Sequence, residues 1–150
     1  MTMGFARMPR WARFSTLCLG GGIAALGQAP QDMWFLTVIA IAGLFSVVAS
    51  DPRRAALQVW VFGVGYFAVA LRWIIEPFLV DAATQGWMAP FAIALMAAGA
   101  ALFWAGFAYL AARIAPRSAI ALGLALVWAE FARAHIFTGF PWALLGHIWV

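Results

Sequence analysis

The sequence predicts an all-α polytopic membrane protein in which five transmembrane helices form a bundle. Its 150 residues are 67% hydrophobic and 9% charged, and the mean hydropathy is +0.97. A soluble domain has about 25% charged residues, so this chain has too little polar surface to cover a water-soluble core. Long apolar segments also recur along the chain, separated by short segments that hold most of the charges. We therefore expect one transmembrane domain over residues 1–150.

The first two expected helices are 14–28 and 33–49. The first is rich in Gly and Ala and also fits a cleaved signal peptide, since Ala25-x-Gly27 is an acceptable cleavage site. A membrane helix is favoured because a short polar turn leads directly into the next apolar run. Small residues four apart, as at Gly21 and Ala25, also allow close helix packing. The second segment has about the minimum length that crosses a bilayer.

The third expected helix is 55–75, interrupted by Gly63 and Gly65. These glycines weaken the helix but let another backbone or a lipid chain come close. The helix is expected to end with Arg72 pairing with Glu76 one turn later. Residues 77–87 are expected to form a loop.

The fourth and fifth expected helices are 88–112 and 119–137, and residues from Gly139 onward form a loop. Helical periodicity places Glu130, Arg133 and Phe137 on one stripe of the fifth helix. The opposite stripe is aromatic and holds Trp128, Phe131 and His135. The sequence Thr138-Gly139-Phe140-Pro141 then ends the helix.

Two interpretations of the Glu130 and Arg133 stripe remain open on spacing alone. One is a structural ion pair, with the arginine extending to the interface at the helix end. The other is a polar site just outside the membrane, covered by Phe140 and Trp142.

The arginines predict the topology. All nine basic residues are Arg, and seven of them lie in the N-terminal segment and in the turns 50–54 and 113–118. The positive-inside rule therefore places the N-terminus in the cytoplasm. Five alternating spans then place residue 150 in the periplasm, as expected for a multi-pass protein of a bacterial inner membrane.

Composition and spacing argue against several kinds of chemistry. The arginines flank apolar spans and do not form a basic face on a soluble domain, so we do not expect nucleic acid binding. His135 and His147 are separated by a proline and lack clustered ligands, so no metal or other cofactor is expected. Cys18 lies in an apolar segment and is expected to be a small buried hydrophobic residue rather than a nucleophile. We predict no catalytic residue in this chain.

Two motifs carry a resemblance. Glu130-Phe131-x-Arg133 is followed by Phe137-Thr138-Gly139-Phe140-Pro141-Trp142 and Gly146, and Gly63-x-Gly65-Tyr66-Phe67 leads to Arg72-Trp73. In these motifs and in the order of its segments, the chain resembles the N-terminal membrane part of the apolipoprotein N-acyltransferases of bacterial inner membranes. The resemblance covers essentially the whole chain.

The resemblance implies an acyltransferase. In that family a cysteine thiolate, assisted by a glutamate and a lysine, takes an acyl chain from a phospholipid. The α-amine of a diacylglyceryl-cysteine apolipoprotein then attacks the thioester. These residues belong to a periplasmic, nitrilase-like domain that follows further membrane helices. This chain has no lysine, so it is expected to be a fragment or an incomplete reading frame that is inactive alone.

The resemblance also indicates a platform for the phospholipid and the lipoprotein. The candidate residues are Tyr66, Arg72, Trp73, Glu130, Arg133, Gly139, Phe140, Pro141 and Trp142. In one hypothesis, acyl chains enter between the third and fourth helices, and Arg72 and Arg133 hold a phosphate. In the other, these arginines are interface anchors and loop supports. Alternative functions are a small transporter or channel component and a non-catalytic membrane scaffold.

Overall fold

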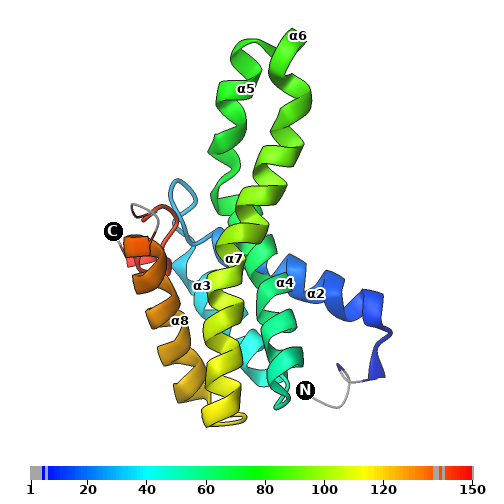
Figure 1. Cartoon of the computed structure of the whole chain (residues 1–150), viewed down its shortest axis with the longest axis vertical. Helices are drawn as coiled ribbons and strands as arrows, with labels where there is room; N and C mark the ends of the chain where they lie inside the picture. The colour runs from blue at the N-terminus through cyan, green and yellow to red at the C-terminus, as the bar shows by residue number, and fades with distance from the viewer. Residues whose placement is uncertain (1–4, 6, 137–138, 140, 150) are drawn as a thin grey trace.

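A computed structural model describes residues 5, 7–136, 139 and 141–149, and the regular elements of this described part are all helices (Figure 1). The predicted all-α class is therefore confirmed for these residues. In chain order the helices are α2 (Arg10–Ala25), α3 (Trp34–Val47), α4 (Pro52–Ala70), η1 (Arg72–Ile75), α5 (Glu76–Val80), α6 (Ala82–Gln85), η2 (Gly86–Met88), α7 (Ala89–Ile114), α8 (Ala119–His135) and η4 (Leu145–Trp149).

Side-chain caps define where α4 and α8 begin. The carboxylate of Asp51 accepts a hydrogen bond from the backbone N–H of Arg54 at 2.9 Å, and Pro52 occupies the first turn of α4. The hydroxyl of Ser118 accepts from the backbone N–H of Ala121 at 3.2 Å and caps α8. Such caps replace hydrogen-bond partners that the first turn of a helix lacks. The charged turns predicted from the sequence thus start the helices that follow them.

Helix α4 is the centre of the bundle. It packs most extensively against α7 and next against α2, while α8 packs against α7. Trp104 of α7 is fully buried and its ring lies 5.1 Å from that of Tyr66 and 5.0 Å from that of Phe67, both on α4. This aromatic group fills the core between α4 and α7.

Glycines allow α4 to approach its neighbours on two sides, as the sequence predicted. A Cβ atom added to Gly65 would lie 1.9 Å from the backbone oxygen of Cys18 on α2, and one added to Gly21 would lie 1.9 Å from that of Phe62. On the other side, a Cβ on Gly63 would lie 2.9 Å from the Cβ of Ala101 on α7. No side chain fits at these glycines, so α2 and α4 touch through their backbones and the backbone of α4 lies against the methyl group of Ala101.

The third expected helix, 55–75, is confirmed as far as Ala70 and is wrong in its last residues. Helix α4 ends at Ala70, and the segment Arg72–Val80 leaves it at an angle of 60°. Pro77 prevents a regular α-helix from running through this segment, because it has no N–H to bond the carbonyl of Trp73 and its ring would clash with that carbonyl. Pro77 instead sits in the first turn of α5, where it is tolerated.

The predicted loop over 77–87 is also wrong. These residues form α5, α6 and η2, which with the first turns of α7 project beyond the other helices (Figure 1). The expected pair of Arg72 with Glu76 does not form, since the ion pair found among the described residues joins Glu130 and Arg133. Arg72 lies in a 3₁₀ turn, where side chains four residues apart do not share a face.

One helical stretch, Ala82–Ile114, is long and apolar enough to cross a membrane, and the bent pair Pro52–Ala70 with Arg72–Val80 would make a second candidate span. Helix α3 is apolar but shorter. In the Ala82–Ile114 stretch only 22% of the most apolar window is buried, unlike the core helix of a soluble protein. Its outward apolar side chains, such as Leu95 and Leu102, are typical of a surface that faces lipid.

The contact of Gly63 with Ala101 also limits the acyl-chain hypothesis. At this level α4 and α7 are in van der Waals contact, which leaves no space for a hydrocarbon chain between them.

Candidate functional site

The two stripes predicted on α8 face in opposite directions. Arg133 is 2% exposed and lies on the inner side of the helix. Trp128 and Phe131 are 57% and 55% exposed, and the ring of His135 lies 4.3 Å from that of Phe131. The ionic stripe therefore points into the molecule, towards the residues that follow α8, and the aromatic stripe points outward.

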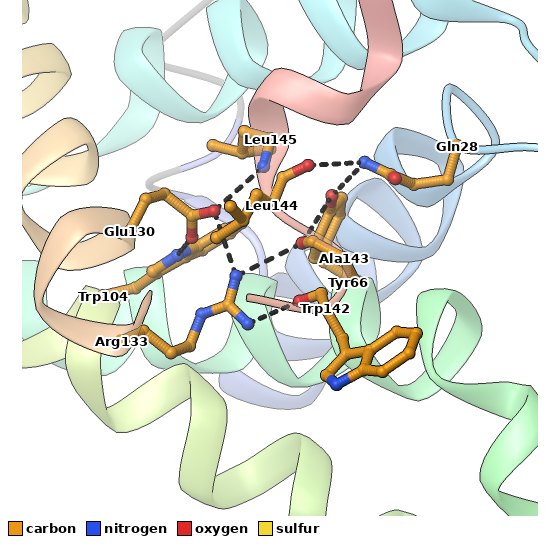
Figure 2. A network of polar contacts seen from close by, with 9 residues as sticks. All are labelled: Gln28, Tyr66, Trp104, Glu130, Arg133, Trp142, Ala143, Leu144 and Leu145. Carbon is orange, nitrogen blue, oxygen red and sulfur yellow. Dashed lines mark hydrogen bonds and ion pairs between the residues drawn. The ribbon is translucent and has the colours of Figure 1, made fainter. Parts of the chain in front are cut away.

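Glu130 joins three parts of the chain (Figure 2). Its Oε1 accepts a hydrogen bond from the indole N–H of Trp104 at 2.6 Å. Its Oε2 accepts from Arg133 at 3.0 Å and from the backbone N–H of Leu145 at 2.9 Å. The carboxylate thus connects α7, α8 and the segment after α8, and charge-assisted bonds of this kind are stronger than neutral ones.

Arg133 holds the same segment through its guanidinium group. Besides Glu130, it donates to the backbone oxygen of Trp142 at 2.6 Å and to that of Ala143 at 3.3 Å. The guanidinium carbon also lies 4.8 Å above the ring of Phe67, within the range of a cation–π contact. Burial and these contacts support the interpretation of Arg133 as a loop support.

Gln28 and Tyr66 attach the other side of the segment (Figure 2). The amide of Gln28 donates to the hydroxyl of Tyr66 at 2.7 Å and to the backbone oxygen of Leu144 at 3.0 Å. The hydroxyl of Tyr66 in turn donates to the backbone oxygen of Ala143 at 3.2 Å. We call residues 142–145 with Gln28, Tyr66, Trp104, Glu130 and Arg133 the loop network.

Arg72 and Trp73 lie beside this network but differ from Arg133. The ring of Trp73 is 5.2 Å from that of Trp142, so the two tryptophans connect η1 to the loop. Arg72 is exposed, and no ion pair involves it in the described part of the chain. Arg72 is thus the accessible arginine at this end, whereas Arg133 is enclosed.

The remaining sequence candidates fall in the segment that links α8 to the loop. Gly139 has a φ of +83°, and a Cβ at this position would lie 2.5 Å from the backbone oxygen of Ala134. Glycine is therefore required there, as the helix-ending motif predicted. Pro141 is exposed. Phe137, Thr138 and Phe140 lie outside the described residues, so the predicted cover by Phe140 is not described.

The loop network is suited to holding the chain in position and not to carrying out a reaction. Its groups are a carboxylate, a guanidinium, an amide, a phenol and an indole, which donate and accept hydrogen bonds but include no activated nucleophile. Cys18 lies on α2 and is exposed, which corrects the prediction that it is buried. Within the described residues, no three side chains from His, Cys, Asp and Glu gather as metal ligands.

Sequence reasoning missed Gln28 and Trp104. Gln28 stands at the end of the first expected helix, and its partners are 38 and 116 residues away in sequence, beyond the reach of local patterns. Trp104 offered a usable signal, because an indole N–H in the middle of an apolar helix needs an acceptor. Glu130 is one of only five acidic residues in the chain, so it was a natural candidate for that acceptor.

Comparison with known sequences gives a consistent result. A family model described as the apolipoprotein N-acyltransferase N-terminal domain matches residues 20–150. A protein of Caulobacter vibrioides named apolipoprotein N-acyltransferase is 40% identical over 157 aligned residues, which cover 95% of this chain and 30% of that protein.

Two further proteins with the same name are similar to the chain. The one from Rhodopseudomonas palustris is 37% identical over 147 residues, covering 91% of this chain and 27% of that protein. The one from Brucella suis is 36% identical over 154 residues, covering 91% of this chain and 28% of that protein. The chain thus spans less than a third of the length of these relatives.

Proposed function

Because the chain belongs to the apolipoprotein N-acyltransferase family, we propose that it is the N-terminal transmembrane domain of such an enzyme. The enzyme would transfer an acyl chain from a phospholipid to the N-terminal amine of the diacylglyceryl-cysteine of lipoproteins. The chain itself would supply the membrane platform and would be inactive alone.

The loop network is the observation that carries this proposal. Five hydrogen bonds fix residues 142–145 to Tyr66 of α4, to Glu130 and Arg133 of α8, and to Gln28 in the segment after α2. A loop held in this way is suited to support a structure that follows it, because bonds to several helices remove its freedom to move. Tyr66, Glu130 and Arg133 would act by positioning this loop.

Arg72 and Trp73 are the platform residues suited to contact lipid. Both are exposed next to Trp142, and an exposed arginine beside tryptophans is typical of the headgroup region. We propose that Arg72 binds the phosphate of the acyl donor or of a phospholipid next to the lipoprotein, whereas Arg133 supports the loop.

We further propose five spans in an inner membrane, with the N-terminus in the cytoplasm and residue 150 in the periplasm. Arg13, Arg54 and Arg117 come from the three Arg-rich segments and line one cavity, which supports a common side for these segments. A membrane-impermeant maleimide tests this in a Cys18→Ala background, since Cys18 is exposed. Asp81→Cys should be labelled from outside intact cells, and Pro116→Cys only after lysis; the opposite pattern would refute the topology.

A chimera tests the function. Residues 20–150 of this chain replace the matching segment of the Caulobacter vibrioides relative, and N-acylation of a diacylglyceryl peptide is measured in phospholipid vesicles. The chimera should transfer the acyl chain and the 150-residue chain should not. A chimera that reaches normal abundance in the membrane but transfers nothing would contradict the proposal.

The transporter alternative gains no support from the ion pair. Glu130 and Arg133 are covered by residues 142–145 and do not line the cavity described below. A gating pair would need to face a path for the transported solute.

A further inference from the structure

We propose that a cavity at the opposite end of α8 from the loop network binds a phosphate group, carried either by an anionic phospholipid or by a soluble phosphate ester. The cavity has a volume of about 610 Å³ and lies where α3 leads into α4 and α7 leads into α8. It shares no residue with the loop network, so this inference goes beyond the proposed function.

Three arginines from separate segments line the cavity. Arg13 comes from α2, Arg54 from α4 and Arg117 from the turn before α8, and Asp51 is the acidic residue among the lining side chains. Asp51 already caps α4, and no carboxylate in the described residues forms an ion pair with these arginines. The cavity therefore has an excess of positive charge that the described part of the chain does not neutralise.

The N-terminal ends of two helices add to the positive charge at the cavity. Helices α4 and α8 both begin at the cavity, since their capping residues Asp51 and Ser118 line it. The N-terminal end of a helix carries a partial positive charge, which favours a nearby anion. The arginines and the helix ends thus act in the same direction.

The backbone of one of these arginines is strained. Arg117 has a φ of +62°, a conformation that Gly or Asn adopts with less strain. A non-glycine residue kept in this conformation is a pointer to a function of its side chain.

Apolar side chains also line the cavity. They are Phe45 of α3, Ala108, Ala111 and Ala112 of α7, and Leu122 of α8. Guanidinium groups match the geometry of phosphate oxygens, and the apolar side chains would contact a hydrocarbon chain attached to the phosphate. This combination favours a phospholipid over a free ester.

Native mass spectrometry of the detergent-purified chain tests the proposal. The probes are dioleoylphosphatidylglycerol, dioleoylphosphatidylcholine and glycerol 1-phosphate. The double variant Arg54→Gln/Arg117→Gln removes two lining arginines, and the control Arg53→Gln/Arg113→Gln removes the same charge at neighbouring positions that do not line the cavity. We expect about tenfold weaker phosphatidylglycerol binding in the first variant and less than about a twofold change in the control.

Each outcome decides a part of the proposal. Competition by glycerol 1-phosphate would identify a soluble ester as the ligand, and binding of phosphatidylglycerol that the ester cannot displace would identify the lipid. Equal losses in the two double variants, or equal binding of both lipids without any effect of the arginines, would overturn the site.

The variant Arg117→Gly distinguishes a loss of binding from a loss of folding. Glycine relieves the strain at φ +62°, so this variant should unfold at the same temperature as the wild type or a higher one. It should still lose phosphatidylglycerol binding. Unchanged binding in Arg117→Gly would count directly against the cavity as a phosphate site.

Discussion

The indole N–H of Trp104 donates to the carboxylate of Glu130 at 2.6 Å. Trp104 is fully buried between α4 and α7, so this bond satisfies a donor that would otherwise be buried without a partner. It also fixes the rotation of α8 against α7. The same carboxylate bonds Arg133 and Leu145, and the fold of the core is therefore coupled to the loop network.

Substitutions of Glu130 should separate the contribution of the Trp104 hydrogen bond from that of the Arg133 ion pair. Glu130→Gln keeps an oxygen that can accept from Trp104 but leaves Arg133 without its carboxylate. Glu130→Ala also leaves the indole N–H unpaired. Breaking a buried charge pair from one side costs about 3–5 kcal/mol, so both variants should be destabilised. Glu130→Ala should unfold at the lower temperature of the two, because it also loses the hydrogen bond from Trp104. Far-ultraviolet circular dichroism during heating in detergent measures both; equal unfolding temperatures for the wild type and Glu130→Ala would argue against this coupling.

Gly65→Ala should disrupt the crossing of α2 and α4. The added methyl group would meet the backbone oxygen of Cys18, which cannot move without shifting α2. Overpacking a core costs about 1–3 kcal/mol. Gly106→Ala is the matched control, because nothing lies within 4 Å of the added Cβ and alanine has the better helix propensity, by about 1 kcal/mol. The control should be neutral or stabilising, and a Gly65→Ala variant that matches it would exclude a tight crossing.

Gly139→Ala should loosen the segment after α8. The position has a positive φ, and the new methyl group would meet the backbone oxygen of Ala134. Gly146→Ala is the control in the same segment, since its added Cβ has open space around it. Limited proteolysis in detergent should cut Gly139→Ala faster near α8, whereas the control should resemble the wild type. Identical cleavage rates would mean that the backbone accommodates the side chain.

Tyr66→Phe should release one side of the loop network and leave the core in place. The ring stays between Phe67 and Trp104, but Ala143 loses one donor and Gln28 loses one acceptor. The loss of one such hydrogen bond costs about 1 kcal/mol. Hydrogen–deuterium exchange should rise in residues 143–147 and stay unchanged in the middle of α7. Exchange that rises equally in both would show that Tyr66 supports the core as a whole.

Sequence patterns predicted the features that depend on local chemistry. The helices near 33–49, 88–112 and 119–137, the close contacts at Gly63 and Gly65, and the need for Gly139 all follow from periodicity or from the absence of a side chain. The family resemblance reached the loop residues in the same way, through a contiguous motif.

Features that depend on distant partners were missed or wrong. Apolar residues continue through Ile74 and Ile75, so the pattern gave no sign that α4 ends at Ala70. The partners of Gln28 and Trp104 come from other helices, and their roles appear only once those helices are packed. The sequence also did not determine which stripe of α8 faces the interior. Periodicity separated the two stripes, and the position of residues 142–145 over Arg133 shows that the ionic one faces inward.

The length of α7 has a consequence for how the chain sits in a bilayer. Its 26 residues make a rod about 39 Å long at the usual helical rise, while the hydrocarbon layer is about 30 Å thick. An upright α7 with Arg113 at one edge of the hydrocarbon layer would therefore carry its proline-containing first turn into the headgroup layer on the far side. Trp87, exposed just before that turn, would then lie at the level of the headgroups, where tryptophan is enriched.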